Sequence, residues 1–209
     1  CYDVFSKLYN EFLGISSHEL YHVWNVKSIR PTQMKPYEFS KENYTRLGYV
    51  TEGVTTYMGD RILYESGVFS LKDYFSELET LLVRHFHNDG RNHYSVAESS
   101  WDTWLDGYVT GAPGRKVSIY VEGALIAMIC DAKIREQTSG EKSLHDVMKG
   151  LYSGSALETN YDKNDYKNRL EKVSGSDFNE IFDKLIYNNT DFTNYLKKAF
   201  SIFGWEYEN

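Results

Sequence analysis

The sequence predicts a single, mainly α-helical domain on three observations. Apolar residues recur every three or four positions through most of the chain, the spacing that places them on one face of a helix. Several of these segments begin with a serine followed three residues later by an acid, as in N-terminal helix caps. Alternation of apolar and polar residues, which marks a half-buried strand, is nearly absent. A chain of 209 residues with 41% hydrophobic and 25% charged residues fits one globular domain.

In the first half of the chain, an apolar stripe defines the first predicted helix and turn residues separate the others. Gly67 ends the second helix, and Ser70 with Asp73 forms the capping box that starts the third. Trp101 and Trp104 share one face of a short fourth helix. The stripe consists of Val4, Phe5, Leu8, Tyr9, Phe12 and Ile15. The predicted helices are residues 3–24, 49–66, 70–87 and 96–108.

The second half opens with the most apolar helix of the chain and continues with shorter amphipathic ones. Ser143 and Ser176 are the expected caps of two of them. The predicted helices are residues 118–138, 143–150, 165–173, 176–188 and 191–202. We expect loops at residues 26–48, which contain two prolines, and 153–162, with the best strand candidate at residues 204–207.

Charge and hydropathy exclude two classes of partner. A net charge of −7 argues against binding to a nucleic-acid backbone. The longest apolar run, Ala124 to Cys130, is far shorter than the ~20 residues that cross a bilayer. Two cysteines give no disulfide framework, and Cys130 is expected to be a buried small hydrophobe.

The first predicted helix contains His18-Glu19-Leu20-Tyr21-His22, an HExxH motif. Residues four apart lie on one face of a helix, so His18 and His22 can present ring nitrogens to one zinc ion. Glu19 is then placed to take a proton from a water whose pKa the metal lowers to roughly 7.

A catalytic zinc takes a third protein ligand, and Glu52 is the natural candidate. It is followed by Gly53 on an otherwise apolar predicted helix, as suits an inward-facing ligand with backbone close by. From residue types alone, an ordinary surface glutamate is the open alternative.

Several further blocks accompany the motif in a fixed order. The stretch from Ser17 to Pro31 is followed by four others: Glu42–Thr45, Thr51–Tyr57, Ser95–Trp104 and Tyr120–Leu125. Their order and spacing from about Ser17 to Leu151 resemble the glycyl aminopeptidase family of zinc peptidases.

That resemblance implies the helical half of a thermolysin-like (gluzincin) catalytic domain that holds one Zn²⁺ per chain. His18, His22 and Glu52 are the implied ligands and Glu19 the general base. It also singles out Tyr120, whose hydroxyl can hydrogen-bond the oxyanion formed from a peptide substrate. The implied activity is aminopeptidase-type hydrolysis of peptide bonds.

Two departures from the family bear on this interpretation. Ser28 and Glu122 stand where the family more often has basic residues, and the β-rich region that precedes the zinc helix is absent. The alternative is therefore a zinc-bearing binding or structural domain that does not catalyse.

The chain begins at Cys1, and its first residues already enter the first predicted helix, so we expect residues 1–209 to be one catalytic helical domain of a longer protein. The expected partners are an upstream β-rich region, a downstream PDZ-type domain, or a second copy of this segment. The upstream region, or a second copy of this segment, would cover an apolar side of the zinc helix that includes Phe12 and Leu13, where the ligands are expected to face solvent. Relatives are often exported, which favours export over the cytoplasm.

The remaining candidates are interpreted as ordinary surface or supporting residues. Lys27 and Arg30 are expected to be solvated or paired with acids. Asn25 is a candidate support for the zinc ligands, whereas Thr56 stands where some zinc peptidases place a histidine-orienting aspartate. Four histidines are expected to be solvated: His85, His87, His93 and His145.

Overall fold

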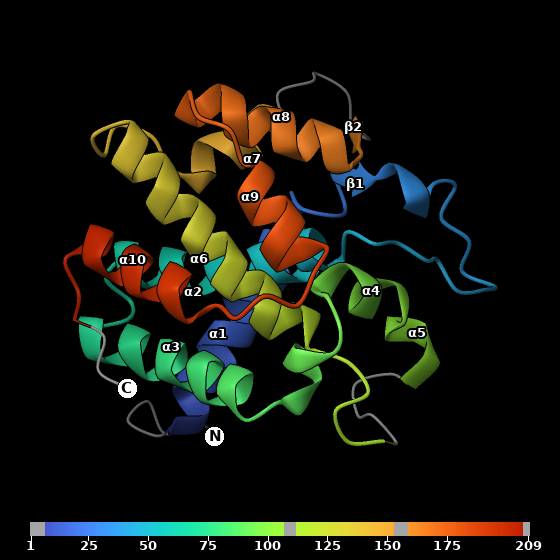
Figure 1. Cartoon of the computed structure of the whole chain (residues 1–209), viewed down its shortest axis with the longest axis horizontal. Coiled ribbons are helices and arrows are strands. Elements are labelled where there is room, and N and C mark those ends of the chain that lie inside the picture. The colour runs from blue at the N-terminus through green and yellow to red at the C-terminus, as the bar shows by residue number, and fades with distance from the viewer. Residues whose placement is uncertain (1–6, 107–111, 153–158, 207–209) are drawn as a thin grey trace.

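The fold is built around one long buried helix, α6 (Ile119–Gln137). Every residue from Val121 to Ala132 is buried, so this part of the helix is covered on all sides, as its mostly apolar sequence predicts. The computed structural model describes residues 7–106, 112–152 and 159–206. Figure 1 shows α6 running diagonally through the middle of the molecule, with the other helices around it.

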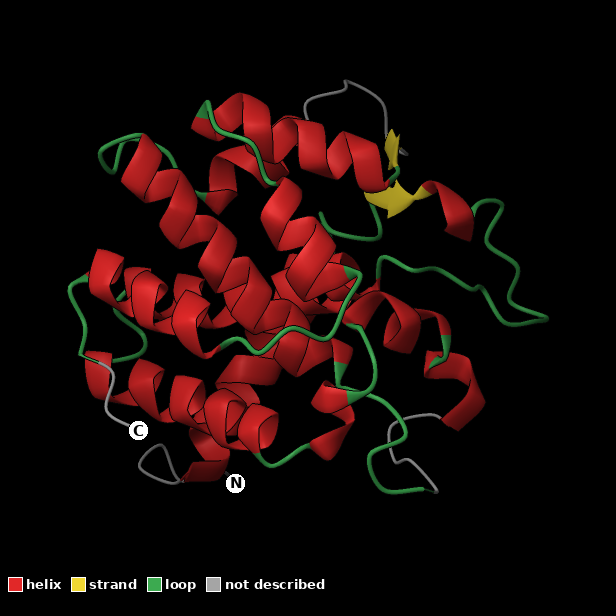
Figure 2. Ribbon diagram, viewed as in Figure 1, coloured by secondary structure: helices red, strands yellow, loops and turns green. Residues whose placement is uncertain are grey.

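The expected mainly α fold class is confirmed, and Figure 2 shows the predominance of helices. The helices around α6 follow the predicted pattern, with the predicted fourth helix broken at Asp102. No helix in the described part of the chain is long and apolar enough to span a membrane. The α-helices are α1 (Lys7–Tyr21), α2 (Thr55–Glu65), α3 (Leu71–Phe86), α4 (Val96–Trp101), α5 (Thr103–Asp106), α7 (Leu144–Tyr152), α8 (Lys163–Ser174), α9 (Asn179–Ile181) and α10 (Thr193–Phe203). The short 3₁₀ and π segments are η1 (Thr32–Met34), η2 (Tyr49–Val54), η3 (Asp89–Asn92) and η4 (Phe182–Ile186).

The π-helix η2 crosses α6 at a pair of glycines. A Cβ on Gly53 would lie 2.3 Å from the Cα of Gly123, so the two backbones are in direct contact. The predicted helix 49–66 is thus a π turn that continues into α2. This crossing fixes Glu52 and the first turn of α6 relative to one another.

Helix α1 packs on α2 at another close approach. The Ser17 hydroxyl donates to the carbonyl oxygen of Gly59 at 2.8 Å, and a Cβ on Gly59 would lie 3.2 Å from the backbone nitrogen of His18. The C-terminal end of α1, with the HExxH motif, therefore lies against the helix that follows Glu52.

Two short strands lie in segments that the sequence analysis assigned to loops. Strands β1 (Ile29–Pro31) and β2 (Thr159–Tyr161) form a parallel two-stranded sheet. Ile29 and Tyr161 are buried in it, so tertiary pairing, not local pattern, creates these strands. The predicted loops 26–48 and 153–162 are corrected accordingly, residues 153–158 lying outside the described part.

Two other local predictions were wrong. No strand forms at residues 204–206, because Gly204 adopts a left-handed conformation that ends α10, and Trp205 donates its N–H to the Phe200 carbonyl. Residue 207 lies outside the described part. Ser176 is not a helix cap; α9 begins after Phe178, and the Asp177 carboxylate accepts from the Asn179 N–H.

Candidate metal centre

The two histidines of the HExxH motif lie at the end of α1 and face η2. The backbone N–H of His22 donates to the His18 carbonyl at 3.2 Å, so the helical spacing extends to His22. Their ring centroids are 4.6 Å apart, with the ring planes nearly perpendicular. Both side chains are 15% exposed.

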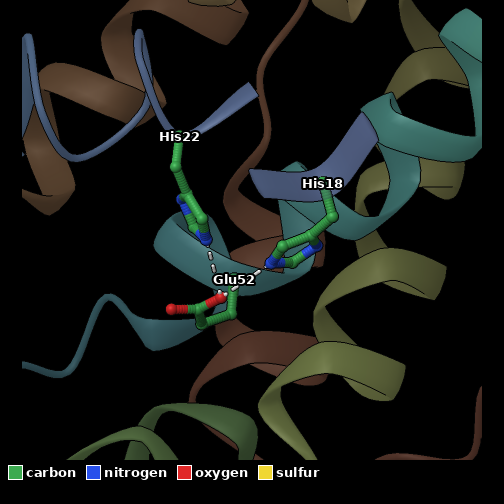
Figure 3. Close-up of side chains that lie close together, drawn as sticks. All are labelled: His18, His22 and Glu52. Atoms are coloured by element: carbon green, nitrogen blue, oxygen red, sulfur yellow. Dashed lines mark hydrogen bonds and ion pairs between the residues drawn. The ribbon is translucent and has the colours of Figure 1, made fainter. Parts of the chain in front are cut away.

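Glu52 completes a three-residue cluster from the π-helix η2. Its Oε2 lies 3.2 Å from His18 Nε2 and 3.3 Å from His22 Nε2 (Figure 3). Ligand atoms of a tetrahedral zinc site, each about 2.1 Å from the metal, are separated by roughly 3.4 Å. Among the described residues, His18, His22 and Glu52 form the one group of three or more histidine, cysteine or acidic residues whose ligand atoms all lie within 4.8 Å of one another.

The outer nitrogens of both histidines are held by hydrogen bonds. His22 Nδ1 lies 3.0 Å from the Asn25 carbonyl oxygen, which can only accept, so this nitrogen carries the proton. His18 Nδ1 lies 3.3 Å from the Thr56 hydroxyl, which itself donates to the Glu52 carbonyl at 2.9 Å and so accepts from His18. In both rings Nε2 therefore faces Glu52. It donates to the carboxylate when the ring carries a proton on both nitrogens, and its lone pair is available to a metal ion when that second proton is absent.

Asn25 links the end of α1 to the π-helix. Its buried side-chain amide donates to the Val50 carbonyl at 2.8 Å and to the Thr55 hydroxyl at 2.9 Å. The amide thus fixes the backbone carbonyl that orients His22. Asn25 thus lies where a residue that supports the metal ligands was expected. The contact of Thr56 with His18 was not predicted.

The charges of the cluster influence one another strongly. Burial alone raises the pKa of Glu52, but hydrogen bonds from His18 and His22 outweigh it and lower this pKa to about 2. For His22, burial lowers the pKa, but the Glu52 carboxylate, the hydrogen bond to the Asn25 backbone and the charge of Glu19 together raise it, so the net shift is upward. A carboxylate that stays ionised beside two imidazoles is a suitable donor set for a divalent cation.

Glu19 and Tyr120 flank the cluster. Glu19 is exposed, and its charge contributes to the raised pKa of His22. The half-buried ring of Tyr120, in the first turn of α6, lies 5.9 Å from the His18 ring, centroid to centroid. Tyr120 also borders a cavity of about 510 Å³ that includes Arg84, Thr103 and Lys116 in its lining. Polar residues from α3, from α5 and from the loop before α6 therefore line the cavity that Tyr120 borders.

A model of the M61 glycyl aminopeptidase family matches residues 11–126, more than half of the chain. The chain belongs to the M61 glycyl aminopeptidase family. The matched range includes the HExxH motif, Glu52 and Tyr120.

This M61 family member also resembles a solved structure. Over 94% of its length it matches the crystal structure of an aminopeptidase N family protein from Idiomarina loihiensis, with 31% sequence identity and a TM-score of 0.83. The match covers 34% of that longer chain, about a third of its length. No curated protein matches the sequence.

One histidine of this M61 domain is not solvated as expected. His85 is buried, and its Nδ1 lies 2.8 Å from the Glu122 carboxylate. Glu122 is the sequence feature that could have indicated a buried histidine, because an acid inside an apolar helix needs a buried partner. His87, His93 and His145 are exposed, as expected.

The two cationic side chains beyond the motif differ from one another. Arg30 donates to the Val26 carbonyl at 3.1 Å and lies over the Tyr37 ring, so it is held locally, whereas Lys27 is exposed. In the described part of the chain, neither forms a hydrogen bond or an ion pair with His18, His22 or Glu52.

Helix α1 presents apolar side chains to solvent beside the metal cluster. Phe12 is 47% exposed, as expected, whereas Leu13 is half-buried. The exposed set also includes Leu8, Ile15 and Leu20.

Proposed function

We propose that this domain holds the catalytic zinc centre of an aminopeptidase-type peptidase. The observation that favours this function is the convergence of His18, His22 and Glu52, with the outer nitrogen of each imidazole already occupied. One Zn²⁺ per chain is the proposed cofactor. Membership of a peptidase family supports peptide bonds as the substrate class.

Zinc, when bound, polarises the scissile carbonyl and lowers the pKa of water to roughly 7. Glu19, one position from His18 and exposed, takes a proton from the attacking water and returns it to the leaving amine. The Tyr120 hydroxyl donates a hydrogen bond to the oxyanion that develops on the substrate.

The cavity beside Tyr120 is the proposed place for part of the peptide. Its volume of about 510 Å³ lies within the roughly 300–1,000 Å³ of typical small-molecule sites. Tyr120 lies near His18 and also lines this cavity. A peptide whose scissile bond lies beside Tyr120 would therefore have one of the two residues that flank this bond in the cavity.

Much of the related chain lies outside its match to this chain. The match covers 34% of the Idiomarina loihiensis structure, and a further β-rich region is proposed to complete the peptide-binding cleft. We also propose that the protein is exported.

Cleavage of a mixed peptide library, read by mass spectrometry, tests the function. The zinc-loaded chain is expected to cleave peptides, and Glu19→Gln to retain zinc but lower turnover by about 10²-fold or more, because the proton acceptor is lost. His22→Ala is expected to lose both zinc and turnover. Zinc binding without Glu19-dependent cleavage would favour the non-catalytic alternative instead.

A further inference from the structure

The buried His85–Glu122 pair joins α3 to the first turn of α6. His85 Nδ1 lies 2.8 and 2.9 Å from the two carboxylate oxygens of Glu122, and the two side chains are 1% and 4% exposed. A carboxylate that is this deeply buried is costly unless it is hydrogen-bonded, so the pair is expected to hold a defined geometry.

The surroundings of His85 keep its ring in place. The ring stacks on Phe192 with centroids 4.9 Å apart. Its Nε2 and the Nε of Arg91 are both buried, have no hydrogen-bond partner among the described residues, and line the same small cavity. The His85 ring is thus held in two ways: Nδ1 donates a hydrogen bond to the Glu122 carboxylate, and the face of the ring stacks on Phe192.

Glu122 lies between two other fixed points of α6. The next residue, Gly123, is in backbone contact with Gly53, and the Ser118 hydroxyl caps the helix by accepting from the Val121 N–H at 3.4 Å. Tyr120 lies inside this tethered turn, two residues before Glu122, with its ring 5.9 Å from that of His18. The direction of the turn therefore sets where the Tyr120 ring lies relative to the metal cluster.

We propose that His85 and Glu122 are positioning residues for Tyr120. Their hydrogen bond sets the rotation of the first turn of α6, while the Gly53–Gly123 contact sets its distance from Glu52. Together these contacts hold the phenol beside His18. The catalytic consequence rests on the proposed function, in which Tyr120 donates to the oxyanion. The geometric claim concerns the protein without metal and is tested separately.

The geometric test uses nuclear Overhauser contacts between the Tyr120 and His18 rings in the protein without metal. The wild type is expected to show the contact. Glu122→Leu is expected to lose it, and Glu122→Gln, which keeps an acceptor for His85, to restore it. The double variant His85→Phe/Glu122→Leu replaces both polar partners by apolar groups, so it is expected to fold and still lose the contact.

Asp131→Asn is the matched control. Asp131 is a buried carboxylate on the same helix and accepts from Tyr57 at 2.7 Å and from Arg135 at 2.9 Å. Its replacement is expected to keep the Tyr120–His18 contact even where it lowers stability. Absence of the contact in the wild type, its persistence in the folded double variant, or its loss in Asp131→Asn would overturn the positioning role.

Kinetics separate this inference from the proposed function. In a chain with Glu19-dependent turnover, Glu122→Leu is expected to lower kcat by about 10- to 100-fold with little change in KM, since a misplaced donor acts in the transition state. The same substitution made in Tyr120→Phe is expected to have no further effect. A full additional loss in that background would overturn the positioning role, whereas absent turnover in the wild type would contradict only the proposed function.

Discussion

At the residue scale, the two histidines of the candidate metal centre are oriented by groups outside the His18–His22–Glu52 cluster. Thr56 and the backbone of Asn25 each accept the Nδ1 proton of one histidine. Such outer contacts fix the tautomer and the direction of the ring, so that the Nε2 lone pair is available to the ion. The two histidines were identifiable from HExxH, whereas these acceptors depend on how η2 lies against α1.

Thr56→Val tests this outer contact. Valine has nearly the shape of threonine but accepts no hydrogen bond, so His18 loses its alignment while the packing is kept. Zinc affinity is expected to fall about 10- to 100-fold, measured by competition with a chromophoric chelator. The control is Thr80→Val, because within the described part of the chain the Thr80 hydroxyl donates only to the Ser76 carbonyl of its own helix. Equal zinc affinity in Thr56→Val and the wild type would contradict the role of Thr56.

Asp60 gives the molecule a pH dependence that does not involve the metal ligands. Burial, with a smaller contribution from Glu77, raises the pKa of Asp60 from 3.8 to about 7. Between about pH 4 and 7 the folded state therefore keeps a proton that the unfolded state has lost. Stability from this group is complete at low pH and falls as pH rises through that window.

Asp60→Asn is expected to remove this loss. Above pH 7 the variant should be more stable than the wild type by on the order of 2 kcal/mol, and near pH 3 the two should be equal, as measured by urea unfolding. Asp73→Asn is a control of opposite sign, because hydrogen bonds from Ser70 lower the pKa of Asp73. That variant should be less stable than the wild type at neutral pH. An Asp60→Asn effect that is the same at pH 3 and pH 8 would rule out the proton linkage.

At the element scale, periodicity and caps located the helices, because each helix buries one stripe of its own sequence. The strands β1 and β2 were missed because their pairing joins segments more than a hundred residues apart. The π character of η2 was also missed, since nothing in the local sequence distinguishes Tyr49–Val54 from an ordinary helical turn. The pair Glu52-Gly53 in the sequence could suggest Glu52 as the third ligand. Its closeness to both histidines, however, depends on how η2 crosses α6 and on how α1 packs on α2.

Gly53→Ala tests the crossing of η2 and α6. The added Cβ would lie 2.3 Å from the Cα of Gly123, so one backbone must move. We expect a loss of about 3 kcal/mol in the free energy of unfolding, and weaker zinc binding because Glu52 shifts with η2. Gly14→Ala is the control, since its Cβ meets only Asp60 at 3.6 Å and alanine favours a helix. Unchanged stability of Gly53→Ala would contradict the close crossing.

At the scale of the whole molecule, the sequence was sufficient for the mainly α class and for the family. Ordered blocks from the HExxH motif to Tyr120 carry the family resemblance, and the matching family range covers them. The buried pair of His85 and Glu122 was not predicted, because it joins two helices whose packing no local pattern specifies.

Zinc K-edge X-ray absorption on the reconstituted chain tests whether His18, His22 and Glu52 bind one zinc ion. We predict one zinc per chain, with two imidazole nitrogens and one carboxylate oxygen at about 2.0–2.2 Å. Glu52→Gln is expected to change the oxygen shell and weaken retention of the metal. A well-folded chain that takes up no zinc at neutral pH, or a spectrum without imidazole scattering, would contradict the account.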